Sequence, residues 1–297
     1  MRASQRSVQR PRALACPASL KGVLSARDAA AALAAGFNRA GVAAAQLPVA
    51  DGGEGTVAAL GREVDGALVV EAAEVIPLDP SRRDVLAASS RPFGELLAIL
   101  EADRLIIGLG GTANMDAGAG LLEVLDRLPA PTTALCDVQT RLYDAPRLYG
   151  PQKGAARKQV RELERRFRRM AQLAPYADLP GSGAAGGLGA ALASLGAELV
   201  AGAPAILDLL GFEPQAYDLV VTGEGRVDAT TAEGKAPAEV ARRCGAAGVP
   251  CVVFGGVVAE AVPGAETIAL SGEPTHAVDD LVALGLRLGT RLLDPMR

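Results

Sequence analysis

Aromatic residues are scarce in this chain: they make up 3% of its 297 residues, and tryptophan is absent. Single-stranded nucleic acids and large protein surfaces are usually bound through aromatic side chains, so the composition disfavours both functions. The net charge of −4 gives no basic surface for nucleic acid either. No apolar run approaches the roughly 18 residues of a membrane-spanning helix. We therefore expect neither a nucleic-acid partner nor a membrane segment.

Histidine and cysteine are too few for two common kinds of site. The single histidine, His276, excludes a zinc site built on several histidines and leaves one residue for any Ser-His-Asp triad. The cysteines form no Cys-x-x-Cys pair and are widely spaced, at Cys16, Cys136, Cys244 and Cys251. In a chain of this length such spacing predicts buried thiols, not a disulfide framework. We therefore expect a cytoplasmic protein.

Lysine is rare as well, and its positions are informative. Only four of the 30 basic residues are lysine, and three of them, Lys21, Lys153 and Lys235, lie next to a glycine. A chain that otherwise uses arginine keeps lysine where a compact ammonium must meet an anion. Coincidence is the alternative, because the chain has 35 glycines.

The remaining sequence alternates between strand and helix patterns. We expect strands at residues 14–16, 44–49, 104–109, 133–138, 218–222, 250–254 and 267–270, and helices at 25–39, 56–62, 92–101, from about 117, and at 155–173, 184–195 and 277–293. This alternation predicts an α/β protein with largely parallel sheets. In such sheets ligands bind at the carboxyl ends of the strands.

The segment PVADGGEGT at 48–56 is the first that carries chemistry. It sets two carboxylates, Asp51 and Glu54, around Gly52 and Gly53. Glycines let backbone N–H groups approach a ligand, and the start of the next helix favours an anion. Carboxylates beside an anion suit a Mg²⁺ held between them. A tight turn capped by Asp51 is the alternative.

The segment GLGGTANMDAGAG at 108–120 follows a predicted strand. Gly110 and Gly111 turn the chain, and Thr112 and Asp116 precede a helix. This is the outline of an anion-binding loop, and a close turn between helix and sheet is the alternative.

Three other segments give weaker signals. Asp137 ends a predicted strand, and Lys153 precedes a helix. Residues 180–189 contain Gly-x-Gly-x-x-Gly, but no strand precedes them, so the dinucleotide fingerprint is rejected. We expect a flexible, ligand-facing loop there instead.

The strongest segment is DLVVTGEGRVDATTAEGKAP at 218–237. A predicted strand leads into Glu224, Arg226, Asp228 and then Lys235. Two acids and two cations this close suit Mg²⁺ binding and the neutralisation of phosphate charge. A surface loop of ion pairs is the alternative. No Walker or protein-kinase motif is present, so a phosphotransferase would need another fold.

Taken in order, these segments resemble the class I glycerate kinases. The matching stretches are ASLKGVLSA (18–26), PVADGGEGT, GLGGTANMDAGAG, ALCDV (134–138), GPQKGA (150–155), GSGAAGGLGAAL (181–192), DLVVTGEGRVD (218–228) and GKAP (234–237). The resemblance implies phosphorylation of D-glycerate by ATP with Mg²⁺, commonly giving 2-phosphoglycerate.

The resemblance also implies two α/β domains with the substrate in the cleft between them. We expect a Rossmann- or flavodoxin-like domain of residues 13–62 and 215–297, with a second α/β domain of residues 63–214 inserted in it. Residues 1–12 are polar and basic, which predicts a disordered extension. A homodimer is one possible assembly.

Site roles follow from the resemblance residue by residue. Asp51, Asp228 and Lys21 are the expected catalytic residues, and Asp116 and Asp137 the expected metal ligands. Substrate or nucleotide is expected to contact Ser19, Gly52, Gly53, Glu54, Gly110, Gly111, Thr112, Lys153, Glu224, Arg226 and Lys235.

Departures from the family pattern keep two alternatives open. Ala18 replaces the usual Asp, and Met115 replaces the Asn that usually precedes Asp116; other departures fall at Thr140, Arg141, Ala229 and Thr230. One alternative is a homologue without turnover that binds a small anion or a nucleotide. The other is a kinase for a related hydroxy or sugar acid.

Overall fold

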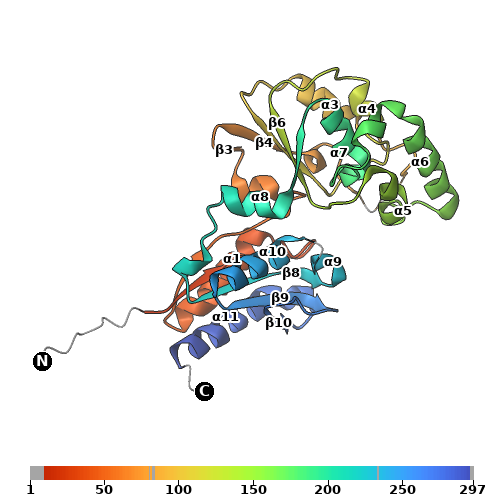
Figure 1. Ribbon diagram of the computed structural model, residues 1–297. Coiled ribbons are helices and arrows are strands. Elements are labelled where there is room, and N and C mark those ends of the chain that lie inside the picture. The colour runs from red at the N-terminus through yellow and green to blue at the C-terminus, as the bar shows by residue number, and fades with distance from the viewer. Residues whose placement is uncertain (1–9, 80, 82–83, 233, 295–297) are drawn as a thin grey trace, which may run out of the picture. The chain divides into compact units, whose positions relative to one another are not determined.

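The computed structural model describes residues 10–79, 81, 84–232 and 234–294. The chain forms two compact units, each containing a five-stranded sheet (Figure 1). The first unit comprises residues 1–49, 213–232 and 237–297, and the second comprises 50–212 and 233–236. The predicted α/β class with largely parallel sheets is confirmed. No described helix is both long and apolar enough to span a membrane.

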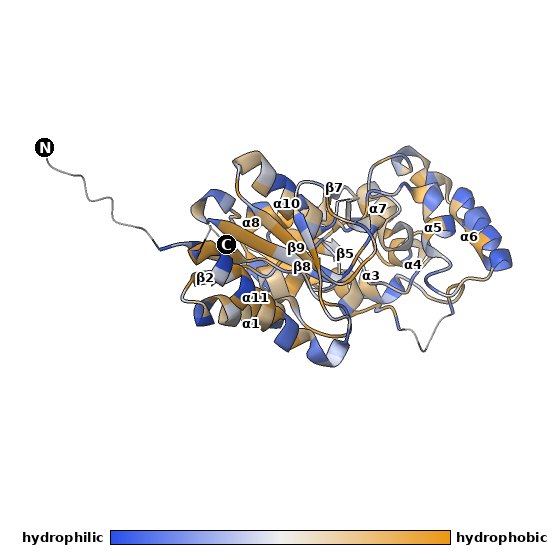
Figure 2. Cartoon of the chain, turned by 90° about the horizontal axis from the view of Figure 1, so that it is seen from below, coloured by the Kyte–Doolittle hydropathy of each residue, from blue (hydrophilic) through white to orange (hydrophobic). Residues whose placement is uncertain are grey.

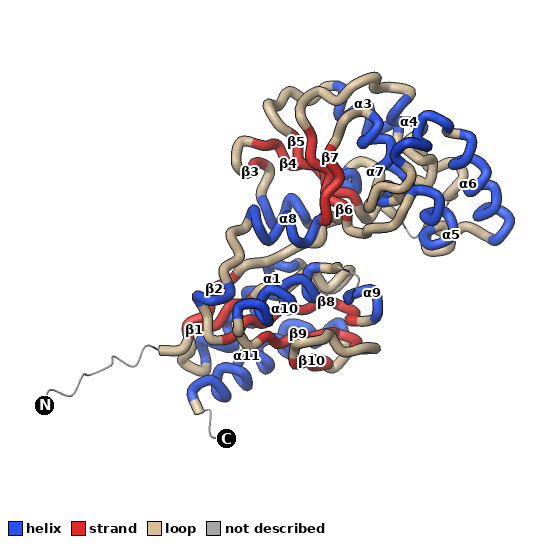
Figure 3. Tube along the Cα trace, viewed as in Figure 1, coloured by secondary structure: helices blue, strands red, loops and turns tan. Residues whose placement is uncertain are grey.

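The sheet of the first unit is entirely parallel, with strand order β10-β9-β8-β1-β2 (Figure 3). Its strands are β1 (Arg12–Ala15), β2 (Ala43–Gln46), β8 (Leu219–Val227), β9 (Cys251–Val258) and β10 (Glu266–Ala269). Strand β1 lies inside the sheet, between β8 and β2, and its Ala-Leu-Ala residues suit burial on both faces.

Helices α1 (Ala26–Arg39) and α11 (Ala277–Leu293) cover one face of this sheet. Ser25 caps α1, its Oγ accepting a hydrogen bond from the Asp28 N–H at 3.1 Å. The two helices touch through glycine: a Cβ on Gly36 would lie 2.2 Å from the Val282 carbonyl oxygen. Their alanine- and glycine-rich faces therefore allow backbone contact.

Helix α10 (Ala236–Ala247), which follows the short α9 (Ala229–Ala232), covers the other face. Its Cys244 hydrogen-bonds Cys251, whose side chain points away from the face occupied by its neighbour Val252. All four cysteines are buried and free, which confirms the prediction of buried thiols.

The second unit has strand order β3-β4-β5-β6-β7, with β3 antiparallel and the others parallel. The strands are β3 (Glu63–Val64), β4 (Ala67–Glu71), β5 (Leu105–Leu109), β6 (Thr132–Cys136) and β7 (Glu198–Ala201). The sequence patterns did not predict β3, β4 or β7, because each is short and flanked by mixed residues.

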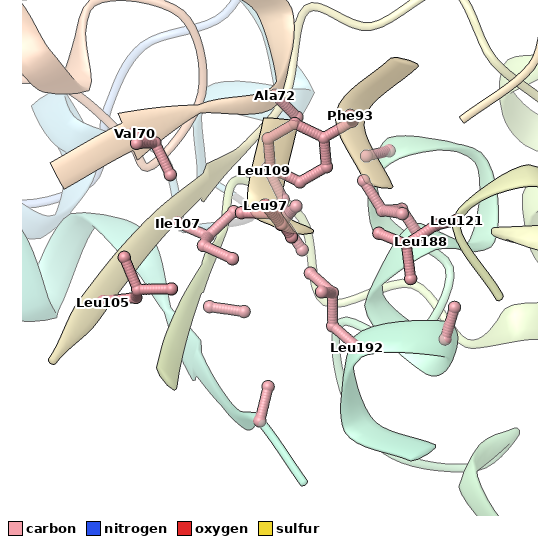
Figure 4. Close-up of a cluster of buried hydrophobic side chains, with 14 of the residues drawn as sticks. Val70, Ala72, Phe93, Leu97, Leu105, Ile107, Leu109, Leu121, Leu188 and Leu192 are labelled. Atoms are coloured by element: carbon pink, nitrogen blue, oxygen red, sulfur yellow. The ribbon is translucent and has the colours of Figure 1, made fainter. Parts of the chain in front are cut away.

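Leucine-rich helices form the main core of the second unit (Figure 4). Alternate residues of β5, including Leu105 and Ile107, face α3 (Arg91–Ala98), α4 (Ala119–Leu122) and α7 (Ala184–Ser194). Ile106 faces the other way and packs with Ile206 of α8 (Gly202–Leu209), on the side where α2 (Thr56–Leu60) also packs.

Helix α6 (Arg157–Arg169) follows the shorter α5 (Ala145–Tyr149) at one side of the second unit. It buries Leu163 and Phe167, and most of its other residues are hydrophilic, as the blue colour of α6 in Figure 2 shows. The 3₁₀ segments of the two units are Ala72–Glu74, Leu142–Asp144, Ala171–Tyr176, Pro214–Ala216 and Pro274–His276.

The structure corrects two boundaries drawn from the sequence. The second unit begins at residue 50, not 63, because α2 packs on β4 and Gly52 lies against Leu135. Strand β8 continues to Val227 instead of ending at 222, so Glu224 and Arg226 are strand residues paired with β9. Of the predicted extension, residues 1–9 lie outside the described residues, and Arg12 begins β1.

Candidate active site

Three segments of the second unit meet at the carboxyl ends of β5 and β6. A Cβ on Gly110 would lie 2.6 Å from both the Gly53 Cα and the Asp137 Oδ2, far closer than atoms can pack. The Asp51 Oδ1 accepts a hydrogen bond from the Gly53 N–H at 3.2 Å. Glycine at 110 is therefore required for the loop of residues 51–55 to approach Asp137 this closely.

Lys153 lies in the interior of the same unit, beside the loop that follows β5. Its Nζ donates to the Asn114 carbonyl oxygen at 2.8 Å and to the Thr112 Oγ1 at 3.4 Å. Burial lowers the pKa of Lys153 to about 8, although the negative charges of Asp137 and Asp116 oppose that shift. A buried ammonium whose pKa is lowered this far, with two carboxylates nearby, is a candidate functional group.

The carboxylate of Asp116 is occupied by hydrogen bonds from the protein. It accepts from the Ser90 N–H (2.7 Å) and Oγ (2.8 Å), and from the Asn114 Nδ2 (3.1 Å). It also accepts from the N–H groups of Gly118 (3.1 Å) and Gly120 (3.2 Å). Because a carboxylate has about four acceptor positions, this geometry favours a role in holding the loop over metal binding.

Asn114 connects this loop to the glycine-rich segment that was expected to face the ligand. Its Nδ2 also donates to the Ala185 carbonyl oxygen at 2.9 Å, and a Cβ on Gly186 would lie 2.1 Å from the Asn114 carbonyl oxygen. Residues 181–193 are buried and α7 forms where a helix was expected at 184–195, whereas the ligand-facing role of the loop before it stays a prediction. Ala185, Gly186 and Gly187 all have positive φ, as wrapping around Asn114 requires.

Glu71, at the end of β4, is a site residue that the sequence patterns missed. Its Oε2 accepts from the Gly55 N–H at 3.1 Å, and its Oε1 accepts from the Val57 N–H at 2.6 Å. The carboxylate thereby holds the loop that carries Asp51 and Glu54. The only sequence signal was an acidic residue ending an apolar stretch, ALVVE.

In the first unit, the segment carrying Ser19 and Lys21 lies along the end of β8. The Ala18 N–H donates to the Gly223 carbonyl oxygen at 2.9 Å. A Cβ on Gly225 would lie 3.4 Å from the Leu20 Cα and 3.5 Å from the Lys21 nitrogen. The side chain of Lys21 is exposed and that of Ser19 half-buried. The fold thus brings the backbone of Lys21 to the strand that carries Glu224 and Arg226.

Thr231 links the two acids of this strand end and was also missed. Its buried hydroxyl donates to the Glu224 Oε1 at 2.8 Å and accepts from the Asp228 N–H at 3.1 Å. The Asp228 carboxylate accepts from the Arg226 Nε at 3.1 Å. The spacing Asp-x-x-Thr at the start of α9 was the available signal.

Lys235 belongs to the second unit and is half-buried.

The carboxylates at these strand ends are candidate ligands for Mg²⁺ bound with a nucleotide. Among the residues that the structure describes, no three His, Cys, Asp or Glu side chains are grouped to hold a metal ion. Mg²⁺ bound with a nucleotide needs one or two carboxylates, because phosphate and water supply its other ligands. Asp137 fits that requirement, because its carboxylate lies at the end of β6 against Gly110.

Both units therefore place carboxylates and lysines near the ends of parallel strands. This arrangement defines an α/β enzyme with sites for anionic substrates.

Comparison with known proteins identifies the class more closely. A profile described as "Glycerate kinase family" matches residues 13–79, 66–130 and 126–272. The chain is 34% identical to the glycerate 2-kinase of Escherichia coli, over 76% of this chain and 80% of that protein. It is 33% identical to a glycerate kinase of Bacillus subtilis, over 82% and 84% of the two chains.

A solved structure agrees with these sequences. The crystal structure of a Salmonella typhimurium LT2 protein that carries the name glycerate kinase 2 superposes with a TM-score of 0.76 and 28% identity. The match covers 97% of this chain and 99% of that one. The chain belongs to the glycerate kinase family, and it is a kinase.

Proposed function

We propose that the protein transfers the terminal phosphoryl group of ATP to D-glycerate and forms 2-phosphoglycerate, with Mg²⁺ as the metal ion. The observation that carries the proposal is the meeting of Gly53, Gly110 and Asp137 in the unit that buries Lys153. Phosphoryl transfer depends mainly on positioning and charge neutralisation, and this arrangement supplies both. The name of the Escherichia coli relative supports the 2-hydroxyl as acceptor.

In the second unit, Asp137 is the proposed metal residue and Lys153 the residue that holds an anionic group. Mg²⁺ bound with ATP supplies charge neutralisation on the phosphates. The prediction that Asp116 binds metal has less support, because the hydrogen bonds described above occupy its oxygens.

In the first unit, Lys21 and Arg226 are proposed to bind anionic groups of the substrates, as is Lys235 of the second unit. The proton of the glycerate hydroxyl passes to a carboxylate, either Asp51 or Asp228. Asp228 is less than one-third exposed and forms an ion pair with Arg226. Asp51 is oriented by the Gly53 N–H.

The test is an ADP-release assay on the purified chain with D-glycerate, ATP and Mg²⁺, followed by identification of the product. We expect turnover on the order of 1–100 s⁻¹ and 2-phosphoglycerate by nuclear magnetic resonance. Formation of 3-phosphoglycerate would contradict the acceptor position. Tight binding of ATP or glycerate without product would favour the non-catalytic alternative, and turnover with another hydroxy acid would favour the related kinase.

The cytoplasmic location and the homodimer stay predictions. Light scattering on the eluted protein measures its mass and checks the dimer.

A further inference from the structure

The buried carboxylate of Glu71 faces two backbone N–H groups of a predicted active-site loop. Glu71 is 6% exposed, and each of its oxygens accepts one of these hydrogen bonds, from Gly55 at 3.1 Å and from Val57 at 2.6 Å. Both N–H groups lie at the first turn of α2, where no helical carbonyl can accept them. Glu71 therefore satisfies two donors that would otherwise be buried without partners.

The same loop is held from its other side by β5. The Thr56 Oγ1 donates to the Gly53 carbonyl oxygen at 2.7 Å. A Cβ on Gly108 would lie 3.0 Å from the Gly52 carbonyl oxygen and 3.3 Å from the Thr56 Oγ1. With β5 filling one side, Glu71 is the contact that fixes the loop from the side of β4.

Negative charges surround Glu71. Burial raises the pKa of Glu71, the hydrogen bonds from Val57 and Gly55 oppose the shift, and the charges of Glu74 and Glu54 add to it. The positive charge of Arg62 interacts with Glu71 and Glu74. Its two Nη atoms donate hydrogen bonds to the Glu74 carboxylate oxygens at 2.6 and 2.7 Å. The charged form of Glu71 is thus held mainly by the loop's N–H groups.

We propose that Glu71 is a positioning residue for phosphoryl transfer, which fixes the loop of residues 51–55 so that Asp51 and Glu54 meet the substrates. The inference rests on the proposed function for its effect on catalysis. It rests on the hydrogen bonds alone for its effect on the loop. Protonation of Glu71 removes an acceptor and weakens the hold on the loop, so the effect of Glu71 disappears in acid.

The first experiment measures the loop directly by hydrogen exchange of the full chain. In Glu71→Gln the amide group faces one of the two N–H donors, so one hydrogen bond is lost. We expect amide exchange in a peptide covering residues 52–58 to rise about 10-fold or more at pH 7. The ratio between variant and wild type should approach one as the pH falls below the raised pKa. The control Glu63→Gln, exposed on β3, should exchange as the wild type does.

The second experiment measures kinetics with D-glycerate and ATP. We expect kcat of Glu71→Gln to fall about 10- to 100-fold at pH 7 with KM nearly unchanged, because a loop displaced by about 1 Å misplaces reacting groups. Glu71→Asp keeps the charge and should recover part of kcat. If Glu71→Gln does not fold, Glu71→Asp carries both measurements, with the same signs and smaller sizes.

The outcomes separate the two proposals. Wild-type exchange in folded Glu71→Gln overturns the positioning role. Faster exchange with unchanged kcat also overturns it, because the loop would then not serve the reaction. A third outcome is faster exchange in Glu71→Gln together with a wild-type protein that does not phosphorylate glycerate. The exchange result would then support the role of Glu71 in fixing the loop, and the missing activity would refute the proposed function.

Discussion

The contact between Gly110, Gly53 and Asp137 gives the sharpest prediction, because one methyl group tests it. In Gly110→Ala the new Cβ would lie 2.6 Å from the Gly53 Cα and from the Asp137 Oδ2. Carbon atoms pack at about 3.5–4.0 Å, so the loop and the carboxylate must separate by about 1 Å. Overpacking of this kind costs about 1–3 kcal/mol of the free energy of unfolding.

The catalytic effect should exceed the effect on stability. A displacement of about 1 Å in positioned groups costs about 100-fold in rate, so we expect kcat/KM with D-glycerate and ATP to fall by that factor. The melting temperature should fall by a few degrees, at about 2–4 °C for each kcal/mol. Coupled ADP release and thermal unfolding measure the two effects on the same preparation.

The chain offers a matched control in Gly245, inside α10. A Cβ at this glycine meets no atom within 4 Å, and its φ is not positive. Gly245→Ala should therefore raise the free energy of unfolding by about 0.5–1 kcal/mol and leave kcat/KM unchanged. Wild-type kcat/KM in folded Gly110→Ala would refute the reasoning, because the close approach would then not matter to the site.

Three further predictions follow from the carboxylates and the buried lysine. In the folded state Lys153 loses its proton near pH 8, and in the unfolded state near the ordinary value of 10.5. The unfolded state therefore binds more protons in this window, and the free energy of unfolding should rise between pH 8 and 10 by about 2 kcal/mol relative to Lys153→Met. Denaturation of both proteins at several pH values measures the difference, and parallel curves would contradict the lowered pKa. Asp116→Asn should lower the free energy of unfolding, measured with urea, by about 2–4 kcal/mol, because the amide hydrogens of Asn would face N–H donors. Asp126 lies on the surface, so Asp126→Asn should leave the free energy of unfolding almost unchanged. Asp228→Asn should lower kcat about 100- to 10,000-fold and change the melting temperature little, since its partner Arg226 is mostly exposed; an unchanged kcat would remove Asp228 from the mechanism.

Much of the fold could be predicted from local patterns. The last helix was predicted at 277–293 and is observed there, because apolar residues recur on one face of a long segment. Strand β8 was predicted too short, since Gly-Glu-Gly-Arg is typical of a loop. In the parallel sheet these glycines allow close packing, and a Cβ on Gly223 would lie 2.2 Å from the Phe254 carbonyl oxygen.

The site was less predictable than the fold, because its residues act through distant partners. Asp116 was recognisable as an acid in a glycine-rich loop, but its hydrogen bonds from Ser90 join residues 26 positions apart. Glu71 had no motif, and its partners lie 14 and 16 positions before it. Charge and spacing in the sequence therefore indicate candidate site residues. The hydrogen-bond donors and acceptors that these residues meet depend on the folded chain.

Strand β1 is paired on both sides in its sheet, which has a consequence for folding during synthesis of the chain. β1 is flanked by β2 and by β8, which lies about two hundred residues later in the chain, and α1 packs on the last helix. The ribosome releases the segments in sequence order, so residues 50–212 emerge complete before the first unit has its core. Domains fold as units during synthesis. We therefore expect the second unit to fold first. The amino-terminal segment should stay unfolded, and accessible to chaperones and proteases, until β8 and α11 have been synthesised.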